Sequence, residues 1–173
     1  MLRKITLTAL VAVLALATVA GAAERKGDFA LGFSNTDAPV GVRYFTSDKL
    51  AVDLGLGFES MDVPSEGDTE TASNFFVEGG VTYVLYDYMD SFFFLRPALM
   101  YASYDELDSG GLDSSFRIAL NLGAEVRLAE RFGLTFQHGL AFQSDSPQGD
   151  GDSMTTITTF GQNVTQAGVW FTF

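Results

Sequence analysis

Apolar and polar residues alternate along most of the chain from residue 28 onward. Between Leu50 and Glu59, every even position holds leucine, valine or phenylalanine, whereas the odd positions hold alanine, glycine, Asp53 and Glu59. Successive side chains of a β-strand point to opposite faces of the sheet. The alternation therefore predicts strands with one apolar face and one small or charged face.

Eight segments of this kind follow one another, separated by turn residues. They span residues 28–34, 40–46, 50–59, 74–85, 92–104, 116–128 and 132–142, and the last one ends at Phe173 and begins as early as Thr156. Pro97 lies in the fifth segment, although a proline inside a strand is normally a feature of sheet edges.

The connections between the segments alternate in length. Short connections at 46–49, 86–91 and 129–131 alternate with long ones at 61–73, 105–115 and 144–153. Only the connection at 35–39 is brief although it belongs to the side of the long connections. Short turns at one end and long loops at the other are typical of membrane barrels. The pattern predicts an all-β fold, namely an eight-stranded antiparallel up-and-down transmembrane β-barrel with short periplasmic turns and longer extracellular loops.

The first residues have the features of a secretory signal peptide. Arg3 and Lys4 precede an apolar run at 5–20, and small residues follow at 20–23. The run is short for a membrane-spanning helix, and a polar segment at 24–28 follows it, so a cleaved signal is favoured over an anchor. We expect a signal peptide at 1–23 and a single barrel domain at 24–173.

The composition is strongly acidic and lacks cysteine. The chain has 22 acidic and 10 basic residues, and loss of the signal peptide leaves 8 basic against 22 acidic residues, a formal charge of −14. Such a charge argues against nucleic acid as a partner. The absence of cysteine excludes disulfides and thiolate metal sites. No second apolar run is long enough for a membrane helix, so a membrane-embedded mature chain must be a closed barrel.

One face of the predicted sheet carries charges among its glycine and alanine residues. The members of this predicted interior network are Arg43, Asp53, Glu78, Arg96, Arg117, Glu125 and Arg127. Isolated charges in a narrow barrel are costly, so we expect acids and bases to pair across strands. The expected pairs are Glu78 with Arg96, and Arg117 with Asp53 or Glu125.

The opposite face is uniformly apolar, as contact with lipid requires, and aromatic residues cluster near the segment ends. Phe92 belongs to the predicted aromatic belt at the short turns, and Tyr104 to the belt at the long loops. Two such belts are typical of membrane barrels. A soluble periplasmic barrel of the lipocalin type, which turns its apolar face inward around a ligand, is the alternative.

The last stretch, Gln166-Ala167-Gly168-Val169-Trp170-Phe171-Thr172-Phe173, resembles the assembly signal of bacterial outer-membrane barrels. The whole mature chain resembles in pattern the small barrels of the OmpX and OmpA-transmembrane-domain type. The resemblance implies a monomer in the outer membrane of a Gram-negative bacterium, in contact with lipid and lipopolysaccharide. It also implies that Gly168, Val169, Phe171 and Phe173 are read by the barrel-assembly machinery, and that the last strand pairs with the first.

Candidate chemistry is sparse. His138 is the only histidine, and Gly139-Leu140 follows it where lipid A deacylases have the motif His-x-Ser-Asn. By parity His138 falls on the lipid-facing side, without an acid at hydrogen-bond spacing. We therefore expect no enzyme activity and no cofactor.

The long connections are rich in acidic residues and contain no basic ones. Their acids are Asp62, Glu66, Asp68, Glu70, Asp105, Glu106, Asp108, Asp113, Asp145, Asp150 and Asp152. The sequence at 150–152 lacks the full ligand spacing of a calcium loop, so no metal site is expected.

A structural or surface-interaction role, with adhesion-type contacts through the acidic loops, is the function that we expect. The alternatives are a narrow pore or small-solute channel and, after it, a lipid A-modifying enzyme.

Overall fold

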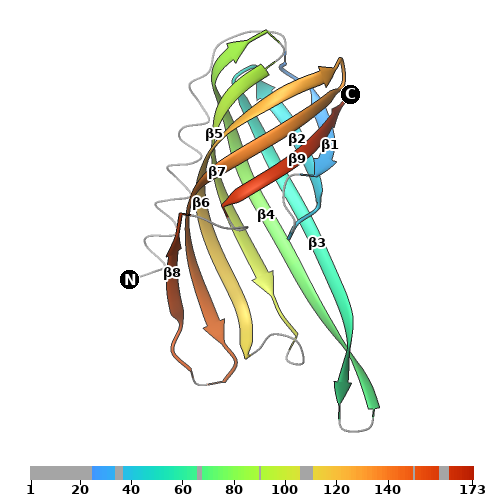
Figure 1. The fold of residues 1–173 in the computed structure, drawn as a ribbon, viewed down its shortest axis with the longest axis vertical. Coiled ribbons are helices and arrows are strands. Elements are labelled where there is room, and N and C mark those ends of the chain that lie inside the picture. Colours follow the sequence, from blue (N-terminus) through green and yellow to red (C-terminus); the bar gives the residue numbers. More distant parts are fainter. Residues whose placement is uncertain are drawn as a thin grey trace.

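The computed structural model describes residues 25–33, 37–65, 68–89, 91–105, 111–149, 151–159 and 164–173 (Figure 1). The predicted signal peptide at 1–23 lies outside these residues. The strands are β1 (Phe29–Phe33), β2 (Val40–Ser47), β3 (Leu50–Ser65), β4 (Asp68–Tyr88), β5 (Ser91–Ser103), β6 (Leu112–Ala129), β7 (Phe132–Pro147), β8 (Met154–Thr158) and β9 (Thr165–Thr172). The described residues contain no helix long and apolar enough to cross a membrane.

The strands form one antiparallel sheet that closes into a ring. Each strand from β1 to β7 pairs with the next one in sequence, β7 also pairs with β9, and β9 pairs with β1. In Figure 1, β9 crosses the front of the ring beside β1 and β7. The prediction of an all-β antiparallel fold that closes on itself is confirmed.

The eighth position of the ring is shared by two strands, where the sequence predicted one segment. β9 pairs with Phe132–His138 of β7, and β8 pairs with Ala141–Asp145 farther along the same strand. Just before β9, Val164 points inward and is fully buried with Ala119 and Ala141. Small residues on β6 and β7 make the room for this side chain. The segment that the sequence placed as early as Thr156 is therefore two strands, and the terminal one begins at Thr165.

Several predicted long connections are partly strand. β3 and β4 pair without interruption as far as Ser65 opposite Asp68, so most of 61–73 is a hairpin that projects beyond the ring (Figure 1). β6 begins at Leu112, and β7 continues to Pro147. We predicted that these strands end where the apolar alternation stops. The strands continue further because the hydrogen bonds between strands join backbone groups and do not require apolar side chains.

Pro97 lies inside β5, which has strands on both sides. Between β4 and β5 the pairing passes from Gly80–Ala98 to Tyr83–Leu95, so the ladder is interrupted opposite the proline. On the other side Pro97 pairs with Leu120 of β6. The proline is tolerated because its missing N–H falls on the interrupted side.

The two faces of the ring differ as the alternation predicted. On the outer face of β3, Val52, Leu54 and Leu56 are 44–47% exposed and Phe58 is 70% exposed, although all are apolar. Leu50 departs from this rule and is buried. The inner face is closely packed with small and charged side chains.

The short-turn end of the ring is filled by apolar side chains. Phe45, Val84, Phe92 and Phe94 are 0–4% exposed and pack together, with Phe45 and Phe92 edge to face at 6.5 Å. Phe92 is thus an interior residue, and its assignment to the outer aromatic belt was wrong. We call these four side chains with Ala51 the apolar plug.

Arg25 covers the apolar plug from the end of the ring. Its guanidinium carbon lies 4.6 Å from the centre of the Phe92 ring, and its Nη2 is 2.6 Å from Asp87 Oδ1. The backbone N–H groups of Arg25 and Lys26 both donate to Asp48 Oδ1, at 2.6 and 2.9 Å. The start of the described chain is therefore held across this end.

Candidate functional site inside the ring

A layer of buried ion pairs lies directly above the apolar plug, with Asp53 of β3 at its centre. The Asp53 carboxylate accepts hydrogen bonds from Arg43 Nε at 2.5 Å, Arg96 Nε at 3.1 Å and Thr82 Oγ1 at 2.7 Å. Arg43 and Asp53 are directly opposite each other in the pairing of β2 with β3. The inner-face alternation thus brings both side chains to the same level of the interior.

Two more carboxylates complete what we call the charge layer. Arg96 Nη2 donates to Glu78 at 2.7 Å, and Arg43 Nη1 donates to Glu125 at 2.6 Å. All five charged side chains are no more than 7% exposed. Buried charges of this kind are tolerated only when they are paired and hydrogen-bonded.

Neighbouring residues are shaped to fit the arginines of the charge layer. The Trp170 ring stacks on Arg43, with 4.1 Å between the guanidinium carbon and the ring centre. A Cβ atom at Gly80 would lie 2.8 Å from Arg96 Nη2, so a side chain there would displace the guanidinium. Glycine on the inner face therefore makes room for the long charged side chains.

The structure brings together most of the predicted network, but with different partners for Arg117. Glu78 and Arg96 lie together as expected. Arg117 bonds neither Asp53 nor Glu125 but Asp37, at 3.3 Å, because Arg43 already lies between those two acids. Arg127 is half-buried near the end of β6 and forms no ion pair with a described residue.

Asp37 reaches Arg117 because Asp37 and Ala38, shortly before β2, lie inside the ring. Ala38 is fully buried and packs on Gly55, while a Cβ atom at Gly57 would lie only 1.9 Å from the Asp37 carbonyl oxygen. Gly57 is therefore required for this approach. Sequence reasoning placed Asp37 in a short external turn, and no sequence signal distinguishes it.

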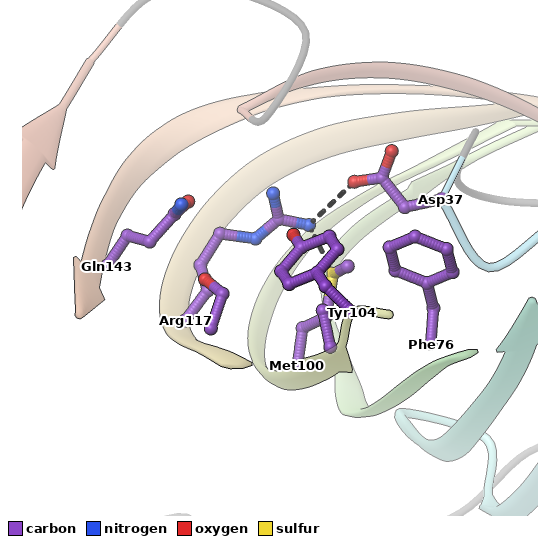
Figure 2. Close-up of a pocket in the computed structure, with 8 residues that line it drawn as sticks. Asp37, Phe76, Met100, Tyr104, Arg117 and Gln143 are labelled. Atoms are coloured by element: carbon purple, nitrogen blue, oxygen red, sulfur yellow. Dashed lines mark hydrogen bonds and ion pairs between the residues drawn. The ribbon is translucent and has the colours of Figure 1, made fainter. Parts of the chain in front are cut away.

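A cavity of about 250 Å³ lies between Asp37 and the loop ends of β4 to β7 (Figure 2). Its lining is Asp37, Phe76, Met100, Ala102, Tyr104, Ser115, Arg117 and Gln143. Phe76 and Tyr104 meet edge to face at 6.0 Å and form an apolar wall with Met100. We call this space the Arg117 cavity.

Tyr104 belongs to this cavity and not to the outer aromatic belt in which it was predicted. Partial burial, and next the negative charges of Asp145 and Asp37, raise the pKa of its hydroxyl above the ordinary value. The nearby Arg117 acts in the opposite direction. The cavity mouth is thus an electronegative region around one buried arginine.

A second cavity, of about 490 Å³, adjoins the first on the other side of Asp37. Its lining is Asp37, Pro39, Phe58, Glu59, Ser60 and Phe76. Among the described strands, only β4 pairs with β3 beyond Leu56, so this cavity lies along an edge of β3 that no other described strand covers. We call it the edge cavity. The two cavities share Asp37 and Phe76.

Other candidate residues lie far from the interior. His138 is exposed on the outer face, and its Nδ1 lies 2.8 Å from Thr165 Oγ1. No group of three or more histidine or acidic side chains in the described part of the chain is arranged to hold a metal ion. Of the acidic loop residues, Glu66, Glu106, Asp108 and Asp150 lie outside the described residues.

The predicted terminal signal forms most of β9. Gly168 is buried on the inner face, whereas Val169, Phe171 and Phe173 are 36–61% exposed on the outer face. Phe171 is opposite Leu31 of β1, and the Phe173 N–H donates to the Phe29 carbonyl at 2.8 Å. The last strand therefore pairs with the first.

The fold defines a closed antiparallel all-β ring with an apolar outer face and a charged interior. No protein-family model matches the chain, and no curated protein matches it either. Among solved structures, it is similar to Ail, the attachment invasion locus protein of Yersinia pestis, with 12% identity, a TM-score of 0.36, and coverage of 84% of this chain and 94% of that one. A likeness this weak carries no functional argument.

Proposed function

We propose that this chain is an outer-membrane β-barrel protein with a structural or surface-contact role. The observation that carries the proposal is the distribution of its side chains. Apolar residues on the outer face of every strand from β2 to β7 are exposed, while Arg43, Asp53 and Arg96 are almost completely buried. In lipid an apolar exterior is stable, and a closed sheet leaves few backbone groups without a partner.

The charged interior supports this reading against a soluble lipocalin-like barrel. A soluble barrel would need its charges outside and an apolar interior around the ligand. Here the charge layer occupies the interior, and its salt bridges span β2, β3, β4, β5 and β6. In a soluble barrel the outer leucine and phenylalanine side chains would have to be shielded from water. No second layer covers them in the described structure.

A structural role is favoured over conduction. The apolar plug and Arg25 occupy the short-turn end, and the charge layer occupies the middle of the ring. An eight-stranded barrel has an interior that side chains just fill. Enzyme activity has no comparable support, since His138 is on the outer face beside Thr165. We propose that the protein is neither a channel nor an enzyme.

The projecting β3–β4 hairpin supports a role in surface contacts. Its exposed residues include Asp62 and Glu70, and no lysine or arginine occurs between Lys49 and Arg96. With the short turns in the periplasm, this hairpin would stand outside the cell. A partner with a basic surface is the kind of molecule that it would contact.

Membrane fractionation with heat-modifiable gel mobility tests the location and the fold together. We expect the protein in the outer-membrane fraction, and a folded band that shifts on boiling. Phe173→Ala should reduce assembly, because Phe173 lies at the β9–β1 seam, where its ring is 5.1 Å from Phe171 and 6.4 Å from Phe29. Phe142→Ala, an outward phenylalanine of β7, is the matched control.

Recovery of the protein in a detergent-free periplasmic fraction would contradict the membrane proposal. Equal assembly of the two variants would contradict a specific role for the terminal strand. A change in lipid A acylation on overexpression would contradict the proposal that the protein is not an enzyme.

A further inference from the structure

Arg117 is bound differently from the two arginines of the charge layer. Arg43 and Arg96 each contact two carboxylates. Arg117 contacts one, from Asp37, at 3.3 Å, and the same Nη2 atom also contacts the Met100 sulfur. Nε and Nη1 of Arg117 have no hydrogen-bond partner in the described structure, although the side chain is only 6% exposed.

These unused donors border the Arg117 cavity. Figure 2 shows the guanidinium between Gln143 and Asp37, and Tyr104 lines the same cavity. Nη1 and Nη2 together form the end of the guanidinium that a carboxylate can bind with both oxygens. Asp37 uses only Nη2, and its side chain is 34% exposed. Asp37 therefore occupies only half of the position in which a carboxylate would bind both Nη1 and Nη2 of Arg117.

The other walls of the cavity are apolar. Phe76, Met100, Ala102 and Tyr104 face the polar side formed by Arg117, Ser115 and Gln143. The adjoining edge cavity adds Phe58 and Pro39, together with the polar residues Glu59 and Ser60, and follows the edge of β3. The two cavities thus provide a cationic head site and, leading from it toward the outer face, a path on which Phe76, Pro39 and Phe58 offer apolar contacts.

We propose that the Arg117 cavity binds a small amphiphile with a single carboxylate and an apolar chain. The carboxylate binds Nη1 and Nη2 of Arg117 and displaces Asp37, and the chain lies along Phe76 toward the edge cavity. Asp37 and Asp145 make the surroundings negative, which disfavours multiply charged anions such as phosphate. The proposal depends on contacts inside the ring and not on the cellular location of the protein.

The five methionines of the chain, Met1 among them, allow a direct test. Met100 lines the cavity, whereas Met61, Met89 and Met154 are 37%, 84% and 64% exposed elsewhere. We would label the methionine methyl groups with ¹³C, place the folded chain in phosphatidylcholine nanodiscs, and titrate octanoate. Octanoate should shift the Met100 signal saturably, while the exposed methionines report non-specific partitioning into lipid.

Matched probes and variants separate the contributions of charge and apolar contact. Arg117→Gln should weaken octanoate binding by about tenfold to a hundredfold, the effect of lost hydrogen bonds to a charged group. Asp37→Asn should strengthen binding, because it weakens the competitor. Arg127→Gln, on the same strand and face but remote from the cavity, should leave binding unchanged. Octanol should bind more weakly than octanoate, and octylammonium should not bind.

Several results would overturn the proposal. One is the absence of a Met100 shift, or a shift shared equally by the exposed methionines. Equal binding of octanol and octanoate would show that the arginine has no part, and preferential binding of octylammonium would show that the acidic mouth dominates. If Arg117→Gln misfolds, Asp37→Asn still tests the proposal, because it is expected to strengthen octanoate binding.

Discussion

Replacement of Arg96 with methionine tests whether the charge layer stabilises the ring. Arg96 lies between two acids, with Nε 3.1 Å from Asp53 and Nη2 2.7 Å from Glu78. Methionine approximates the apolar stem of arginine, so the change removes charge with little change in packing. The charge layer then keeps three carboxylates and one guanidinium, where it had two guanidiniums.

The expected loss of stability follows from these contacts. A hydrogen bond to a charged group contributes about 1.5–3 kcal/mol, and Arg96 makes two of them in the charge layer. Removal of one partner of a buried ion pair costs about 3–5 kcal/mol. The first route gives about 3–6 kcal/mol and the second about 3–5 kcal/mol, so we expect the free energy of unfolding to fall by about 3–5 kcal/mol. Asp53→Asn should cost less, because the net charge of the layer then changes from −1 to 0.

Urea titration of the protein folded into lipid vesicles measures these losses. Trp170 is the only tryptophan, is buried, and stacks on Arg43, so its fluorescence reports on the interior. Arg127→Met is the control and should change the free energy of unfolding by no more than about 0.5 kcal/mol, because Arg127 is half-buried and forms no ion pair with a described residue. A loss below about 1 kcal/mol for Arg96→Met, or a larger loss for Asp53→Asn, would refute the reasoning.

Two further predictions concern the interior on either side of the charge layer. Gly57→Ala should destabilise the protein by about 1–3 kcal/mol in the same titration, because its Cβ would collide with the Asp37 backbone. Gly79→Ala is the control and should not destabilise the protein, because a Cβ atom there would have nothing within 4 Å. Equal effects of the two substitutions would contradict the inward position of Asp37. Phe92→Ala should cost about 3–5 kcal/mol and remove part of the apolar plug. In planar bilayers the wild type and the outward-facing Phe93→Ala should show no conductance, and a conducting wild type would show that the plug does not seal the ring.

Alternation along single segments predicted the strands and the two faces well. The run from Leu50 to Glu59 needed only the period of a strand to place Asp53 on the opposite face from Leu54. The pairing of Glu78 with Arg96 also followed from the sequence, because adjacent strands bring same-face residues together. The strand ends were less predictable, since β3 and β4 continue through residues whose alternation is weak.

The break between β8 and β9 could not be predicted from alternation. Turn-forming residues such as Gly161 and Asn163 are the only local signal in the sequence. The deciding contact is the packing of Val164 against Ala119 and Ala141, which lie on strands far away in the chain. Local pattern contains no information about which distant small residues leave room for an inward side chain.

The sequence by itself determined the strand class, the alternation of inward and outward side chains along most of each strand, and the acidic character of the chain. These properties depend on neighbours within a few residues. Only the tertiary structure decided that Arg43 binds both Asp53 and Glu125, that Asp37 turns inward over Gly57 to reach Arg117, and that Phe92 lies inside. Each of these contacts depends on which side chains from different strands lie at the same height along the axis of the closed ring. The register of the strands and the closure of the sheet together determine that height.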